Sequence, residues 1–266
     1  RHSARCCAAL LRLVICCDDK KGDEGMTRII LSGCNGKMGK VIAACVSDRE
    51  DAAIVAGIDL NTESDGSYPV YATPQECFTQ GPKADVVIDF SHPSVTCSLM
   101  DAAVAANLPV VMATTGLGEE ELDAVHRAAE QIPVFSSANM SLGVNLLVEL
   151  AKKAAVALGI EYNIEIVERH HNQKVDAPSG TAMMIADELK SVVDFDAEYV
   201  YDRHHVRKKR DPREIGLHAI RGGTIVGEHE VIFAGRDEIL TLSHSARSKD
   251  IFATGAINAA VFLSKQ

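Results

Sequence analysis

The feature that most constrains the fold is a regular alternation of short apolar strands with helical patterns, which begins at Met26 and continues to Leu158. The expected strands are 28–31, 54–58, 85–90, 109–113 and 133–135, and the expected helices are 37–47, 99–106, 119–130 and 144–158. Nearly continuous apolar strands separated by helices are typical of a parallel sheet with helices on both faces. The sequence therefore predicts an α/β fold with an N-terminal, Rossmann-like, doubly wound parallel sheet.

The pattern changes after Tyr162. A strand at 163–168 and a helix at 181–191 are followed by three strand patterns in succession, 214–221, 224–233 and 238–244. Strands that follow one another without intervening helices favour an antiparallel or mixed sheet. We therefore expect a second, α+β domain with a mixed sheet over 151–244, and a first domain over 26–150 that the last segment, 245–266, rejoins.

A glycine-rich turn follows the first strand and opens the first helix. Gly33, Gly36 and Gly39 are spaced as G-x-x-G-x-x-G, in place of the commoner G-x-G-x-x-G. Such a turn lets backbone N–H groups approach a pyrophosphate at the N-terminus of a helix. The second strand leads to Asp59, about twenty residues past the last glycine, where an acidic residue binds ribose hydroxyls. Strand, turn, helix and acidic residue in this order favour a dinucleotide site over a purely structural turn.

The expected cofactor is NADH or NADPH, and the sequence leaves the choice open. Asp59 opposes a 2′-phosphate by charge repulsion, whereas Lys37 and Lys40 place cations nearby. The loops 113–116 and 137–140 follow later strands at the carboxyl edge of the sheet, where ligands bind in open α/β folds. Each loop is a candidate for the nicotinamide side, and an ordinary strand-end turn explains each one about equally well.

The densest group of titratable residues lies between a strand and a helix, over 165–182. Its loop carries the side chains of His170, His171 and Lys174, and the helix begins with Ser179, Gly180 and Thr181. Backbone N–H groups at this helix start predict a carboxylate or phosphate site, with proton donors and positive charge beside it. The two adjacent histidines are also potential zinc ligands, but no cysteine or acidic residue recurs at ligand spacing, so we expect no metal.

Composition and charge narrow the choice of partners. The formal net charge is −10, which argues against nucleic acid, and no apolar run reaches about eighteen residues, so we expect no membrane span. We interpret the basic run 207–210 as a solvated loop. Four of the eight cysteines lie in the first seventeen residues, before the folded pattern begins, and the other four are scattered singly with no paired metal spacing, so we expect free thiols and a cytoplasmic location.

Residues 1–25 precede the first strand and are expected to lie outside the fold. The segment has arginines and a short apolar stretch that Arg12 interrupts, and charged residues follow it. Met26 stands immediately before the first strand, and we interpret it as the natural start. A leader or expression remnant therefore fits 1–25 better than a targeting peptide does.

The string Glu-Ile-Val-Glu-Arg-His-His-Asn-Gln-Lys-Val-Asp-Ala-Pro-Ser-Gly-Thr-Ala over 165–182 resembles the signature of the 4-hydroxy-tetrahydrodipicolinate reductase family. The likeness covers nearly all of 26–263 and includes the glycine turn, Asp-Phe-Ser-His-Pro, Thr-Thr-Gly, Asn-Met-Ser-Leu-Gly-Val-Asn, and Arg-Gly-Gly through Val-Gly-Glu-His. A signature of this length is highly specific. The chain departs from the family pattern at Met140, where Phe is common, and at Lys249, where Arg is frequent.

The resemblance implies roles for individual residues. His170 matches the family's catalytic acid/base, and Lys174 matches its proton donor. His171, Gly180 and Thr181 match positions that hold the substrate carboxylates, and the chemistry of the helix start adds Ser179 to this set. The matched cofactor contacts are Gly33, Cys34, Asn35, Gly36, Lys37, Met38, Asp59, Ala113, Thr114, Thr115, Ser137, Ala138, Asn139 and Met140.

The resemblance also implies an activity and an assembly. It implies a homotetramer that reduces 4-hydroxy-tetrahydrodipicolinate, a small dicarboxylate heterocycle, with NADH or NADPH and with loss of water, in the diaminopimelate route to lysine. Hydride is expected to cross a cleft between the domains while Lys174 or His170 supplies a proton. Two alternatives stay open: a related reductase for another dicarboxylate, and a catalytically silent nucleotide-sensing protein of the same fold. The retention of His170 and Lys174 argues against the second.

Overall fold

A computed structural model of the chain describes residues 25–64, 66–137 and 139–266, and the interpretation of 1–24 as a leader lies outside them. The described residues form two compact units. One is Leu142–Lys249, and the other consists of the described residues up to Ser141 together with Asp250–Gln266. We call the one that contains the glycine turn the first unit and Leu142–Lys249 the second unit. The expected divisions at 150 and 244 fall inside a helix and a strand of the second unit. The chain instead divides immediately before two helices, which begin at Leu142 and at Asp250.

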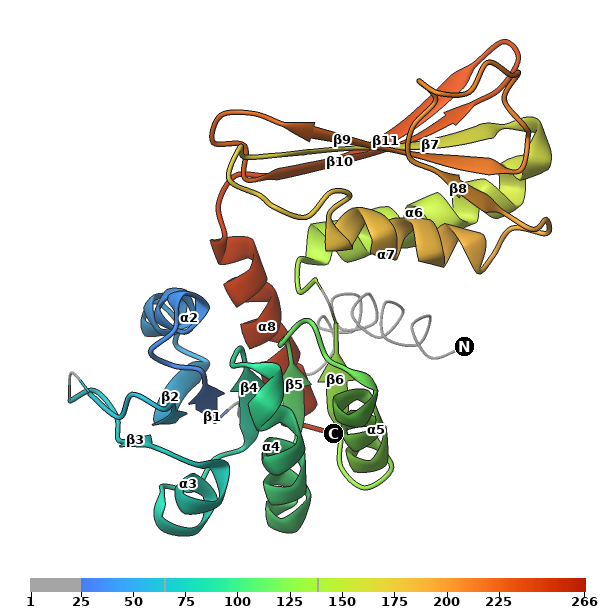
Figure 1. Cartoon of the computed structure of the whole chain (residues 1–266). Helices are drawn as coiled ribbons and strands as arrows, with labels where there is room; N and C mark the ends of the chain where they lie inside the picture. The colour runs from blue at the N-terminus through green and yellow to red at the C-terminus, as the bar shows by residue number, and fades with distance from the viewer. Residues whose placement is uncertain (1–24, 65, 138) are drawn as a thin grey trace. The chain divides into compact units, whose positions relative to one another are not determined.

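The first unit contains a six-stranded sheet in the order β3-β2-β1-β4-β5-β6, and every neighbouring pair is parallel (Figure 1). Its strands are β1 (Thr27–Ser32), β2 (Ala52–Ile58), β3 (Val70–Tyr71), β4 (Val86–Asp89), β5 (Val110–Met112) and β6 (Val134–Ser136). This is the order of the dinucleotide-binding Rossmann fold, so the predicted doubly wound sheet is confirmed.

Two groups of helices accompany this sheet. They are α2 (Lys37–Ser47) and α8 (Asp250–Leu263), which contact each other, and α3 (Pro74–Gln80), α4 (Pro93–Ala106) and α5 (Glu119–Ala129). The second group packs on strand residues such as Ile30, Val87 and Met112. All four residues of β4 are buried, as expected for a strand covered on both faces. Among the described residues, no helix is both long and apolar enough to cross a membrane.

α3 and β3 were not predicted, and α4 begins at Pro93, six residues before the predicted start at Leu99. The apolar pattern of α4 is weak over its first turn, so periodicity does not reveal it. Pro93 at the first helical position, after a His92 side chain that accepts the N–H of Ser94, marks the true start. β3 has only two residues, which is too short for an alternating pattern.

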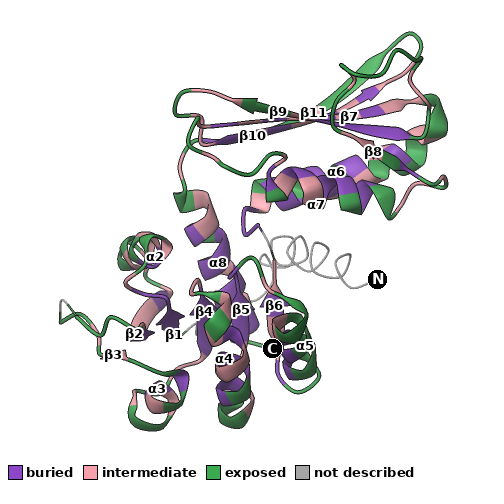
Figure 2. Ribbon diagram, viewed as in Figure 1, coloured by how far each residue is buried: buried purple, intermediate pink, exposed green. Residues whose placement is uncertain are grey.

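The second unit contains a five-stranded mixed sheet in the order β11-β10-β7-β9-β8, with two helices on one face (Figures 1 and 2). Its elements are α6 (Leu142–Leu158), β7 (Asn163–His170), α7 (Gly180–Lys190), β8 (Glu198–Val200), β9 (Glu214–Arg221), β10 (Gly227–Ala234) and β11 (Ile239–Ala246). β10 is antiparallel to β7 and β11, whereas β9 is parallel to β7 and β8. The predicted mixed sheet is therefore confirmed, and β8 is an addition to it.

Alternate residues of β7 are buried, and its buried side chains join those of α6 and α7 in a single core. The strand thus has one face toward the helices and one away from them. Glu168 and His170 are the last two residues on the helix-facing side of β7, at 0% and 8% exposure. Two polar side chains at the edge of an apolar core mark this end of the strand.

The basic run 207–210 differs from the solvated loop that we expected. The guanidinium of Arg210 donates five hydrogen bonds of 2.5–2.9 Å, to acceptors on Glu165, Asn163, Asp211, Ile164 and Glu214. Lys208 forms an ion pair of 3.0 Å with the buried Glu214. Arg207 and Lys209 are exposed. The interpretation was wrong for Arg210, because its five donors meet acceptors that β7 and β9 bring together from distant parts of the sequence.

Candidate functional site

The glycine turn has the compact geometry that a phosphate-binding turn needs. Gly33 has a φ of +79°, and a Cβ there would lie 2.5 Å from the carbonyl oxygen of Phe90. Its N–H donates to the carbonyl of Ile58 at 2.8 Å, and the Gly36 N–H donates to the Gly33 carbonyl at 3.1 Å. Gly36 then caps α2 without a side-chain hydrogen bond, so the first N–H groups of α2 have no side-chain acceptor at the cap.

Asp59 joins this turn to the loop that follows β2. Its Oδ2 accepts the backbone N–H of Asn35 at 3.0 Å, and its Oδ1 accepts that of Asn61 at 3.1 Å. The Asn35 side chain donates to the carbonyls of Asn61 and Glu63 at 2.6 and 3.0 Å. The side chain of Leu60 is 90% exposed. The acidic residue that the motif predicted thus lies against the glycine turn.

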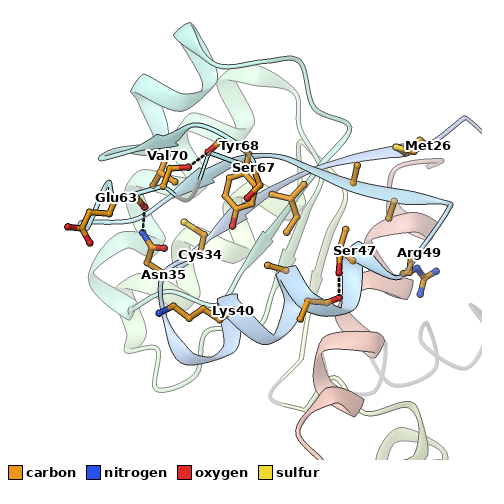
Figure 3. Close-up of a pocket in the computed structure, with 17 residues that line it drawn as sticks. Met26, Cys34, Asn35, Lys40, Ser47, Arg49, Glu63, Ser67, Tyr68 and Val70 are labelled. Atoms are coloured by element: carbon orange, nitrogen blue, oxygen red, sulfur yellow. Dashed lines mark hydrogen bonds between the residues drawn. The ribbon is translucent and has the colours of Figure 1, made fainter.

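A cavity of about 1080 Å³ lies in the first unit and begins at this turn (Figure 3). Cys34 and Asn35 line it together with residues of α2, of β2 and of the segment before β3, including Tyr68. Burial, followed by the charge of Asp59, raises the pKa of the Cys34 thiol to about 11. The thiol therefore stays protonated at neutral pH and lines the cavity as an apolar group.

Asp89 at the end of β4 is a residue that the sequence analysis did not single out. It is fully buried, and it accepts the hydroxyls of Ser91 and Thr114, each at 2.6 Å. Burial raises the pKa of Asp89 above its usual range, although hydroxyl donors oppose the change. The sequence signal was present: an acidic residue ends a strand that is otherwise apolar. Thr114 of the predicted cofactor set is therefore held to β4 beside the glycine turn.

The other predicted nicotinamide-side residues lie after β5 and β6. The Ala113 N–H donates to the Asp89 carbonyl at 2.9 Å, and Thr115 is exposed. The Ser137 hydroxyl donates to the carbonyl of Asn139 at 2.8 Å, which closes a short turn. Met140 is 2% exposed. Ala138 lies outside the described residues.

The second unit brings a buried carboxylate, an imidazole and a guanidinium together. Glu168 Oε2 lies 2.6 Å from His170 Nδ1, and Arg221 binds both carboxylate oxygens at 2.7 Å. The N–H of Ser179 donates to Oε1 at 3.0 Å. Burial alone would raise the pKa of Glu168, but these donors outweigh it and hold the pKa below its usual value. Glu168 is therefore an ionised, fully hydrogen-bonded carboxylate inside the unit.

The Ser179 bond corrects one prediction. We expected the Ser179 amide to point out of the helix start toward an anion, and this was wrong, because that amide donates to Glu168. The Ser179 hydroxyl caps α7 by accepting the Ala182 N–H at 3.2 Å, and the residue is 1% exposed. Gly180 is exposed and Thr181 is half-buried, so these two residues keep the predicted position at the start of α7.

His229 completes the buried cluster from β10. Its ring packs edge-on against that of His170, with centroids 5.2 Å apart, and its Nε2 lies 3.2 Å from the Ser179 hydroxyl. Burial, together with the nearby His170, lowers the pKa of His229 to about 3. His229 is therefore neutral at physiological pH.

Lys174 and His171 lie in the loop between β7 and α7. The Lys174 N–H donates to the His171 carbonyl at 3.2 Å, and the ammonium forms an ion pair of 2.9 Å with Asp176. The hydrogen bond from Lys174 holds the pKa of Asp176 below its usual value, and the Gly180 amide contributes to the same effect. A carboxylate thus already lies beside the lysine and the start of α7. Among the described residues, no group of three or more His, Cys, Asp or Glu side chains is arranged to hold a metal ion.

Two family models match this chain. The model described as "Dihydrodipicolinate reductase, N-terminus" matches residues 27–140, and the one described as "Dihydrodipicolinate reductase, C-terminus" matches residues 143–266. The chain belongs to the dihydrodipicolinate reductase family. The resemblance stated from the signature at 165–182 is confirmed by these matches.

Relatives within the dihydrodipicolinate reductase family are similar over most of their length. A protein of Caldanaerobacter subterraneus subsp. tengcongensis named 4-hydroxy-tetrahydrodipicolinate reductase is 52% identical over 91% of this chain and 94% of its own. One of the same name from Clostridium novyi is 48% identical over 90% and 93%. The structure of a dipicolinate-bound dihydrodipicolinate reductase from Paenisporosarcina sp. TG-14 aligns with a TM-score of 0.74 and 25% identity, covering 90% of this chain and 96% of that one. A Lactobacillus casei scyllo-inositol dehydrogenase with bound NAD(H) shares the fold, at 12% identity and a TM-score of 0.57, covering 91% and 88%.

Proposed function

We propose that the chain reduces 4-hydroxy-tetrahydrodipicolinate to tetrahydrodipicolinate with NADH or NADPH, with loss of water, in the diaminopimelate route to lysine. One observation carries the proposal: the strand that leads into the signature loop of the family ends with buried Glu168 and His170, and Arg221 of the neighbouring strand binds Glu168. The likeness to reductases of that name extends over nearly the whole chain.

The residues proposed for the cofactor fit a dinucleotide. The turn from Gly33 to Gly36 leaves no room for a Cβ at its start, and the uncapped N-terminus of α2 offers N–H groups to a pyrophosphate. Asp59 lies where its carboxylate can accept ribose hydroxyls once they replace the Asn35 and Asn61 amides. The bound nicotinamide supplies the hydride. The choice between NADH and NADPH rests on Asp59, whose charge opposes a 2′-phosphate, and on Lys37 and Lys40, whose charges attract one.

The residues proposed for the substrate fit a dicarboxylate. Lys174 and the exposed start of α7 at Gly180 already interact with the carboxylate of Asp176, so a carboxylate of the substrate finds the same donors there. His171 follows β7 and Thr181 is the second residue of α7, so both add polar groups at the ends of this loop. We propose that substrate carboxylates displace Asp176 from Lys174 when they bind.

The reaction replaces a hydroxyl of the heterocycle by hydrogen. The hydroxyl leaves as water, a hydride adds to the resulting conjugated imine, and one proton neutralises the charge that develops on the conjugated nitrogen system. We propose that His170 or Lys174 delivers this proton, because His170 ends β7 and Lys174 lies in the loop that follows it, and both side chains can donate a proton. The transfer across a cleft between the domains stays a prediction.

We further propose that the protein works in the cytoplasm as a homotetramer, as the resemblance implies. The resemblance implies that the subunits pair through the sheets of their second domains, and the exposed face of the sheet of the second unit supports that arrangement. Ile220 and Ile239 share its face away from α6 and α7 with exposures of 45% and 69%. Light scattering on the purified chain tests this: we expect four times the chain mass, and a monomer would contradict it.

The activity is tested by generating the unstable substrate with the preceding synthase and following the loss of reduced-nicotinamide absorbance. We expect turnover by the wild type and by Lys209→Ala, whose residue is exposed in the same unit, and loss of turnover in His170→Ala. Binding of the cofactor without any turnover would instead support a nucleotide-sensing protein. Turnover only with another dicarboxylate would support a related reductase.

A further inference from the structure

We propose that Glu168 is the positioning residue for His170: its buried carboxylate fixes the imidazole so that Nε2 is the nitrogen that exchanges a proton with the substrate. This inference rests on the proposed function, since it assigns a role within the same reaction. It concerns a residue two positions before His170, with its side chain on the same side of β7.

The hydrogen-bonding capacity of the two groups sets the tautomer. An ionised carboxylate has only acceptors, so the nitrogen 2.6 Å from Glu168 Oε2 must carry the hydrogen, and that nitrogen is His170 Nδ1. In the neutral ring Nε2 is then the free acceptor, and in the charged ring it is the free donor. Glu168 is 0% exposed, so water does not compete for this bond. Nε2 is thereby assigned as the nitrogen that gives up and regains the proton.

The carboxylate itself is held from two other elements. Arg221 at the end of β9 donates a hydrogen bond of 2.7 Å to each carboxylate oxygen of Glu168. It also donates to the carbonyl of Asp176 at 2.6 Å. The Ser179 amide, immediately before α7, adds a bond of 3.0 Å. Such a bidentate pair resists rotation of the carboxylate. Glu168 therefore ties the orientation of His170 to the loop that carries Lys174.

The imidazole ring is confined from the neighbouring strand as well. Gly227 is the first residue of β10, and a Cβ there would lie 3.1 Å from His170 Nε2. The His229 ring packs edge-on at a centroid distance of 5.2 Å and an interplanar angle of 73°. A rotated His170 ring would lose its bond to Glu168. The same bond thus fixes both the tautomer and the direction of Nε2.

Replacement by the amide tests this role. In Glu168→Gln, the new NH₂ group can donate to Nδ1, which selects the opposite tautomer, with hydrogen on Nε2. We expect kcat in the synthase-coupled assay to fall by about 100-fold, with the KM for the cofactor changed by less than about threefold. The matched control is Glu214→Gln, since Glu214 is 1% exposed and ion-paired to Arg203 and Lys208 in the same sheet. We expect its kcat to stay within about threefold of the wild type.

Nitrogen NMR of the full chain reports the tautomer of His170 directly. A purely structural role of Glu168 would leave this tautomer unchanged in the variants. The His170 signals are assigned by their loss in His170→Asn. We expect an Nδ1–H neutral tautomer in the wild type and in Glu214→Gln, and an Nε2–H tautomer in Glu168→Gln. The same tautomer in all three proteins, or equal loss of kcat in the two glutamine variants, would overturn the inference.

Failure of the proposed function and failure of the Glu168 inference can be told apart. If the wild type does not turn over the substrate, the proposed function fails, and the His170 tautomer still decides the Glu168 inference. If Glu168→Gln does not fold, Arg221→Lys replaces it, because lysine keeps the charge and loses the two-pronged grip on Glu168. We then expect kcat to fall at least about tenfold with unchanged cofactor binding; an unchanged kcat would overturn the inference.

Discussion

The carboxylate of Asp59 accepts the backbone N–H of Asn35 at 3.0 Å, so the acidic residue that follows the second strand contacts the glycine turn that follows the first. The two residues are brought together by the parallel pairing of β1 with β2, in which Ser32 lies beside Ile58. A negative charge is therefore fixed at the part of the turn where the adenosine ribose is proposed to bind. The effect of this charge on the preference for NADH or NADPH can be tested.

Removing that charge should shift the preference toward NADPH. For Asp59→Asn we expect the ratio of kcat/KM with NADPH to kcat/KM with NADH to rise about tenfold, because the like-charge repulsion with a 2′-phosphate disappears. Steady-state kinetics with both cofactors measure this. The control is Glu63→Gln, a nearby carboxylate whose side chain does not contact the turn amides. An equal ratio in wild type and Asp59→Asn would show that Asp59 does not face the ribose.

Lys174 is proposed to act in the chemistry and in holding the substrate, and not in cofactor binding. For Lys174→Ala we expect kcat to fall by about 100-fold, while the Kd for the nicotinamide cofactor, measured by fluorescence titration, stays unchanged. Lys209→Ala, at an exposed position, should retain the wild-type kcat. An unchanged kcat in Lys174→Ala would remove this lysine from the mechanism.

The neutral, buried His229 predicts a dependence of stability on pH. Its pKa is about 3 in the folded chain and 6.5 for an unperturbed histidine, so between these values the unfolded chain binds a proton that the folded chain does not. The free energy of unfolding should therefore fall as the pH drops from 6.5 toward 3, by at most about 1.4 kcal/mol per unit from this group.

Urea unfolding at a series of pH values measures this slope. In His229→Gln, which can still bond to the Ser179 hydroxyl, the slope between these pH values should be shallower than in the wild type. His205→Gln should keep the wild-type slope, because the His205 side chain is 81% exposed. Identical slopes in all three proteins would show that His229 is accessible to protons in the folded state.

Arg210 is predicted to anchor its loop to the sheet. Arg210→Lys should lower the free energy of unfolding by about 2 kcal/mol, because a lysine ammonium has three donors and a single point of attachment in place of five fixed donors. Chemical denaturation measures the change. Arg207→Lys, at an exposed position in the same run, should change it by less than about 0.5 kcal/mol. Equal denaturation midpoints for the two variants would contradict the anchoring role.

The sequence predicted those parts of the molecule that local patterns determine. Apolar strands and the glycine turn were sufficient to predict the first sheet as parallel and Rossmann-like, and the spacing to Asp59 singled out that residue, although its bond to the turn was not predicted. β3 and β8 were missed because two or three residues carry no periodic signal. Thr114 was named as a cofactor contact, but its bond to the buried Asp89 depends on the pairing of β4 with β5.

The composition of the buried cluster depends on strand register, which the sequence does not specify locally. Glu168 meets Arg221 because β9 lies parallel to β7 with His170 opposite Arg221, and it meets the His229 strand because β10 pairs on the other side. These partners are more than 50 residues away along the chain. The sequence of the loop predicted that the Ser179 amide binds an anion. In the structure this amide donates to Glu168 Oε1 instead. The titratable loop was therefore identified, and the carboxylate that organises it was not.

The proposed activity is the transfer of a hydride from a nicotinamide to a dicarboxylate heterocycle. The most direct test uses cofactor that is deuterated at the transferred position of nicotinamide C4 and substrate that the preceding synthase generates. The mass of the product is then measured by mass spectrometry. We expect the wild type to form a tetrahydrodipicolinate that carries one deuterium, in step with loss of the reduced cofactor, and His170→Ala to form none. A product without deuterium, or no product from a wild type that binds the cofactor, would contradict it.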